Sequence, residues 1–200
     1  MNKNVVTRTY SSTQYITVAE TKKHLRIVSN DDDSYIATLL DACFDFASKY
    51  VGFEIRKSTV DYFFESTTDG NLHIPARIME LTSVKYRDSN GDLQTLASTE
   101  YDEVLSISAN YGYDVQIINA PSSMYGYGWK YKVTVVEGFG KSTDSIDAGK
   151  IFPESLRHGI YLLAEHLYTQ RGSQVIGASV AALDWNHEHL FYPYAIREFV

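Results

Sequence analysis

The feature that most constrains the fold is a change of hydrophobic pattern that occurs twice along the chain. Residues 17–52 and 153–172 carry apolar side chains three and four residues apart, which is typical of helices. Between them, residues 57–139 form short segments rich in β-branched and aromatic residues, and these predict about six largely antiparallel strands. We therefore predict an α+β fold, in which the N- and C-terminal parts form a small helical bundle with a large antiparallel β insertion between them.

The first helical part carries clear end signals. Thr17 and Glu20 have the spacing of a capping box, so a short helix is expected over about residues 18–26. A longer helix follows in "SNDDDSYIATLLDACFDFASKYVG", where one of Asp31 to Asp33 is expected to cap the start and Gly52 to end the helix.

Turn signals and chain length give the remaining organisation. Asn90-Gly91 lies between two strand-like runs and predicts a hairpin. Residues 1–16 are polar and without a period, so we expect an arm or an extra edge strand there. The 200 residues are expected to form a single domain, 1–200, in which residues 173–200 are an extended C-terminal tail.

The stretch "FPESLRHGIYLLAEHLYTQRG" predicts a helix that begins at Pro153 and ends before Gly172. One apolar stripe of this helix consists of Leu156, Ile160, Leu163 and Leu167. Further apolar side chains, on other sides of the helix, are Tyr161, Leu162 and Tyr168. A helix that is apolar on more than one side is buried on more than one side. It is either the central helix of its own core or a helix that also contacts a neighbouring subunit, in which case these three residues are expected at the interface.

The C-terminal tail is unusually aromatic. Residues 173–182 are small and predict a flexible link. The aromatic residues that follow are Trp185, Phe191, Tyr192, Tyr194 and Phe199. Because this short segment contains Pro193 and has no clear period, it has no obvious way to bury these rings by itself. We expect it either to dock on a partner protein or to pack across the helices of its own chain.

Charge and composition exclude several classes of protein. The net charge is −7, from 18 Lys and Arg against 25 Asp and Glu, which argues against tight binding of nucleic acid through its phosphates. No apolar run is long enough to span a bilayer, and the N-terminal residues lack a secretory apolar segment, so we expect synthesis and folding in a cytoplasm. The single Cys43 excludes an internal disulfide and a multi-cysteine zinc site.

Motifs that carry chemistry are not found. The sequence has no nucleotide-binding loop, nucleophile elbow or zinc-protease motif. His187, Glu188 and His189 are the best metal candidates, since on a strand the two histidines would share a face, but no third ligand is identifiable nearby. Lys130 and Lys132 lie among aromatic residues, as in a stacking platform for single-stranded nucleic acid, which the net charge opposes. We expect no catalytic residues, no metal and no cofactor.

The order of four segments resembles the head–tail connector (adaptor) proteins of tailed bacteriophages with long flexible tails. These segments are "ITVAETKKHLRI" with "DDDSYIATLLDACFDFASKYVG", then "LTSVKYRDSNGDLQTL", "YKVTVVEGFG" and "FPESLRHGIYLLAEHLYTQRG". The resemblance covers roughly residues 16–172. Residues 1–16 and 173–200 are not part of the pattern.

The resemblance implies a structural virion protein of the neck, between head and tail, and not an enzyme or a membrane protein. Proteins of this family form a ring of about twelve copies that joins the portal protein to the next neck or tail-completion protein. DNA passes through the lumen without tight binding, and the aromatic tail would dock on the portal. The alternative is a tail-terminator-like or host-interaction binding module that uses the tyrosine-rich β region, and the third reading is an uncharacterised enzyme.

Overall fold

The structure is a computed structural model. It describes residues 5–11, 15–65, 70–74, 76–106, 112–122, 124, 126, 128–140, 151–170 and 186–195. The chain divides into two compact units. The β unit comprises residues 1–12, 56–139 and 196–200, and the helical unit comprises residues 13–55 and 140–195. Helices and antiparallel sheets occur together, which confirms the α+β class.

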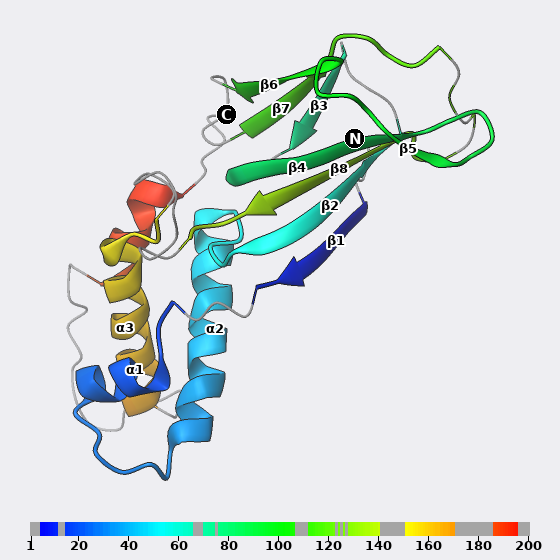
Figure 1. Ribbon diagram of the computed structural model, residues 1–200. Helices are drawn as coiled ribbons and strands as arrows, with labels where there is room; N and C mark the ends of the chain where they lie inside the picture. The colour runs from blue at the N-terminus through cyan, green and yellow to red at the C-terminus, as the bar shows by residue number, and fades with distance from the viewer. Residues whose placement is uncertain are drawn as a thin grey trace. The chain divides into compact units, whose positions relative to one another are not determined.

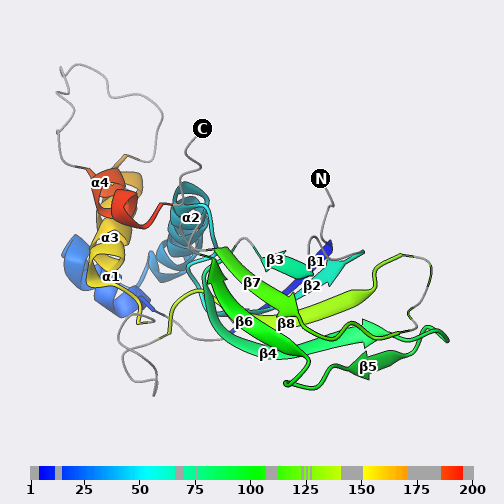
Figure 2. The same cartoon turned by 90° about the horizontal axis from the view of Figure 1, so that it is seen from above.

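In the described part of the chain, the β unit consists of two antiparallel sheets (Figures 1 and 2). In spatial order, the five-stranded sheet consists of β1 (Val5–Tyr10), β2 (Ser58–Phe64), β8 (Tyr131–Glu137), β4 (Ile78–Arg87) and β5 (Leu93–Thr95). The three-stranded sheet consists of β3 (Asn71–Ile74), β7 (Gly112–Ile117) and β6 (Tyr101–Ser106). The expected extra edge strand is confirmed, because β1 pairs with β2 at the end of the larger sheet.

Alternation of side chains explains how the sheets bury one face. Along β8, Tyr131, Val133 and Val135 are buried, and the residues between them are half-exposed. These side chains share one core with Leu72 of β3 and Val115 of β7, so apolar faces of both sheets meet in a single core. The other face of the larger sheet remains at the surface of the β unit.

The expected hairpin at Asn90-Gly91 is confirmed between β4 and β5. Gly91 adopts a φ of 91°, which residues other than glycine rarely adopt. The Asp88 carboxylate accepts hydrogen bonds from the backbone N–H groups of Asn90 and Asp92 and from the side chain of Gln94. These hydrogen bonds lower the pKa of Asp88 below its usual value, and the bond from Gln94 has the largest effect.

A buried carboxylate ties the edge strand β1 to the interior of the β unit. Glu137, at the end of β8, is 1% exposed. Its Oε2 accepts a hydrogen bond of 2.8 Å from Nη2 of Arg8 on β1, and its Oε1 accepts one from the Tyr62 hydroxyl on β2. Burial, followed by the nearby Glu137 charge, raises the pKa of Tyr62 well above its usual range. The three residues form one network across three adjacent strands.

The helical unit contains four α-helices and a short 3₁₀ turn in its described residues (Figure 1). They are α1 (Val18–Leu25), α2 (Asp33–Val51), α3 (Glu154–Thr169), α4 (His187–Phe191) and η2 (Tyr192–Tyr194). The capping box of Thr17 and Glu20 is confirmed at α1, and Gly52 ends α2 with a φ of 86°. Helices α1, α2 and α3 pack on one another, and α4 packs on α2 and α3. Where an extended tail was expected, residues 187–194 are therefore helical.

The core of the helical unit lies between these helices. Its buried side chains include Ile36, Leu40, Cys43, Phe44, Phe152, Leu156, Ile160 and Phe191. Cys43 is a small core residue at 0% exposure. Burial raises the pKa of its thiol to about 12.

We expect the Cys43 thiol to be almost unreactive toward a disulfide reagent at neutral pH and to react rapidly in denaturant. Only the thiolate attacks, and the folded state both hides the sulfur and disfavours its charge. Folding raises the pKa of the Cys43 thiol, so burial of the neutral thiol contributes to stability. This contribution is fully present below the pKa of the thiol in the unfolded chain and decreases as the pH rises toward 12. Reaction rates between pH 7 and 9 measure the effect, and fast reaction in native buffer would contradict it.

Candidate functional site

Helix α3 presents its expected stripe to the core of the helical unit, with one exception. Leu156 and Ile160 are completely buried and Leu163 is 5% exposed. Leu167 was expected in the same row but is 37% exposed, so that prediction is wrong. Leu167 lies in the last turn, since α3 ends at Thr169, and the end of a helix has fewer neighbours to cover it.

Tyr161 contacts α1 of its own chain. Its ring stacks on His24 with centroids 5.1 Å apart and an interplanar angle of 18°. Nε2 of His24 lies 3.2 Å from Oε2 of Glu165, and the His158 ring meets His24 edge-on. Burial is the largest cause of a raised pKa at Tyr161, and the Glu20 charge adds to it. The side of α3 that carries Tyr161 therefore packs against α1.

Tyr168 contacts the start of α2. Its hydroxyl donates a hydrogen bond of 2.5 Å to Oδ2 of Asp32, and its ring lies 6.1 Å from that of Tyr35. Asp32 is the N-cap residue of α2, but its carboxylate makes no capping hydrogen bond. Leu162 is half-buried. Tyr161 and Tyr168 thus have partners in their own unit, as expected for a central core helix, and their role at a subunit interface stays a prediction.

The aromatic tail is partly accounted for by α4 and η2. Phe191 is completely buried, and its ring lies against Gly159 of α3, where an added Cβ would come within 2.5 Å of Phe191 Cε1. The Tyr194 hydroxyl lies 2.7 Å from Oγ of Ser155, whereas Tyr192 is 52% exposed. Trp185 and Phe199 lie outside the described residues. Phe191 is therefore buried against helix α3 of its own chain. Docking of the tail on a partner stays a prediction.

The histidines of the tail lie on a helix and not on a strand. Asn186 caps α4, so His187 and His189 are two positions apart on a helix and do not share a face. The His187 ring packs edge-on against Phe46 and Phe191, and burial is the main cause that lowers its pKa. Among the described residues, no group of three His, Cys, Asp or Glu side chains is placed to hold a metal ion.

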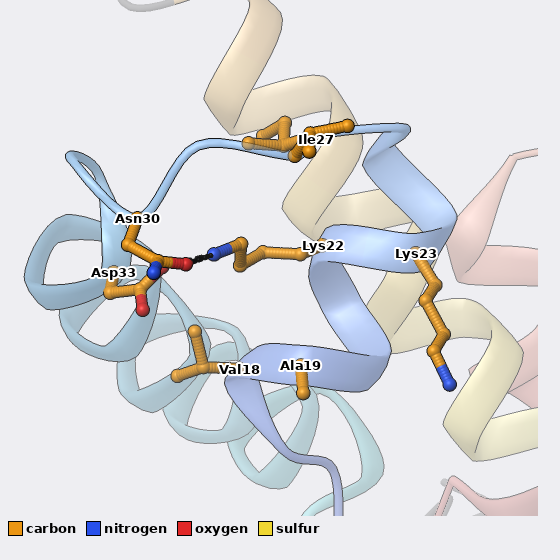
Figure 3. A pocket seen from close by; sticks show the side chains of 8 residues that line it. Val18, Ala19, Lys22, Lys23, Ile27, Asn30 and Asp33 are labelled. Atoms are coloured by element: carbon orange, nitrogen blue, oxygen red, sulfur yellow. Dashed lines mark hydrogen bonds and ion pairs between the residues drawn. The ribbon is translucent and has the colours of Figure 1, made fainter.

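An open hollow of about 530 Å³ lies between α1, the following turn and the start of α2 (Figure 3). Its lining residues are Val18, Ala19, Lys22, Lys23, Ile27, Val28, Asn30 and Asp33. Nζ of Lys22 donates to Oδ1 of Asn30 and lies 2.7 Å from Oδ1 of Asp33 (Figure 3). The ammonium group thereby joins α1 to the start of α2 through Asp33, the first residue of that helix.

One contact within the helical unit and one within the β unit join residues that are distant in the sequence. Gly159 lies in the middle of α3, where a glycine is unfavourable, and that position is the one signal for the close approach of Phe191. On the larger sheet, the Arg87 guanidinium lies over the Trp129 ring at 3.9 Å from its centroid, and Phe63 packs on the same indole at 4.8 Å. Nζ of Lys132 lies 5.7 Å from the centroid of the same Phe63 ring, so this lysine also has an aromatic neighbour.

The chain folds into a helical unit and a two-sheet β unit. Comparison with known proteins identifies the class of protein to which it belongs. The profile of the family described as phage gp6-like head-tail connector protein matches residues 15–119, which is more than half of the chain. The chain belongs to this head-tail connector family. A comparison with curated proteins finds no significant match.

Three solved chains with the same fold come from gene transfer agent particles. A chain in the neck of an empty gene transfer agent particle, computed with C6 symmetry, superposes with a TM-score of 0.70 at 16% identity, with 97% of each chain covered. A chain from the virion of the native gene transfer agent particle has a TM-score of 0.70 at 17% identity, covering 96% of this chain and 97% of that one. A chain in the neck of the native particle, computed with C12 symmetry, has a TM-score of 0.63 at 15% identity and 97% coverage of both. In the part of this chain that the structure describes, no helix is long and apolar enough to cross a membrane.

Proposed function

We propose that this chain is a structural subunit of a virion neck, where copies form a ring that joins the portal vertex of the capsid to the neck or tail. The observation that carries the proposal is the family match over residues 15–119, together with the shared fold of neck proteins across nearly the whole chain. Those neck structures were computed with sixfold and twelvefold symmetry, and closed cyclic symmetry is the usual basis of a ring.

The remaining parts of the proposal concern the arrangement and the partners. Residues 13–55 and 140–195 supply the helical unit and residues 56–139 are the β insertion between them, a division that the two compact units support. The net charge of −7 suits a lumen through which DNA passes without being held. Portal docking is assigned to the tail, where Tyr192 offers an exposed ring. We propose that the subunit interface includes Tyr161, Leu162 and Tyr168, although the two tyrosines also stabilise their own unit.

Native mass spectrometry of the purified chain over a range of concentrations tests ring formation. We expect a discrete oligomer of about twelve copies at high concentration, because closed rings stop growing at one size. Class averages from electron microscopy should show an annulus of the same number of subunits. A chain that stays monomeric at every concentration, and that also fails to bind portal-bearing capsids, would contradict the proposal and favour a monomeric binding module.

A further inference from the structure

We draw no further inference here: the strongest candidate, the open hollow around the exposed Val28 between α1 and the start of α2, carries nothing because no described residue shows what covers it.

Discussion

Replacing Phe191 by alanine is expected to lower the free energy of unfolding of the helical unit by about 3–5 kcal/mol, the usual cost of removing a buried phenylalanine ring. The ring is completely buried, lies directly against Gly159, and contacts the ring of Tyr50 at a centroid distance of 5.9 Å. Chemical denaturation followed by circular dichroism measures the effect. An unchanged midpoint would show that α4 does not belong to the core.

Tyr192 provides the matched control for Phe191, because it is an aromatic residue of the same tail but is 52% exposed. Tyr192→Ala should change stability by less than about 0.5 kcal/mol. If the tail also docks on the portal, this variant should lose attachment to portal-bearing capsids while keeping its melting temperature. The two substitutions therefore separate a structural role of the tail from a role in docking.

Gly159 gives an independent check on the same contact. Alanine is normally better than glycine within a helix by about 1 kcal/mol, but here its Cβ would come within 2.5 Å of the Phe191 ring. We expect Gly159→Ala to destabilise the wild-type chain and to be neutral or stabilising when combined with Phe191→Ala. This change of sign in a double-mutant cycle is specific to a direct contact. Additive effects would show that the ring and the glycine do not meet.

Replacing Arg8 by alanine is expected to destabilise the β unit by about 3 kcal/mol, because it leaves the Glu137 carboxylate buried without its charged partner. The Asp61–Lys132 pair on the outer side of the same sheet is the control. Its side chains are 25% and 23% exposed, and Lys132→Ala should cost at most about 1 kcal/mol. Combining Arg8→Ala with Glu137→Gln should recover part of the loss, since the amide can still accept a hydrogen bond from Tyr62.

The same network predicts how the stability of the β unit depends on pH. Burial and Glu137 raise the pKa of Tyr62 in the folded state, so its neutral form is favoured on folding. This contribution is fully present below the unfolded tyrosine pKa of about 10 and decreases above it. Tyr62→Phe should therefore lose less stability than the wild type between pH 9 and 11, measured by urea denaturation at each pH. Equal losses in both proteins would contradict the assignment.

The sequence by itself determined the elements whose causes lie within a few residues. The capping box at Thr17 and the Asn90-Gly91 hairpin depend on neighbours in the chain, and both are found where expected. The connector family was also recognisable, because it rests on the order of such elements. The sequence predicts about six strands over residues 57–139, and the described part of that region contains seven, β2 to β8, because short strands such as β5 carry little periodic signal.

Only the tertiary structure decided which side chains are used inside the chain and which remain at its surface. Arg8 and Glu137 are 129 residues apart, and Tyr168 and Asp32 are 136 apart, so no local pattern could pair them. The tail alone is too short to bury its rings, yet Phe191 is covered because Gly159 leaves room for it on a helix about thirty residues earlier. Lys85 and Lys132 likewise became neighbours only through the register of β4 and β8. The physical reason is the same in each case: hydrophobic burial and strand register bring distant segments together, and they depend on the whole chain and not on sequence spacing.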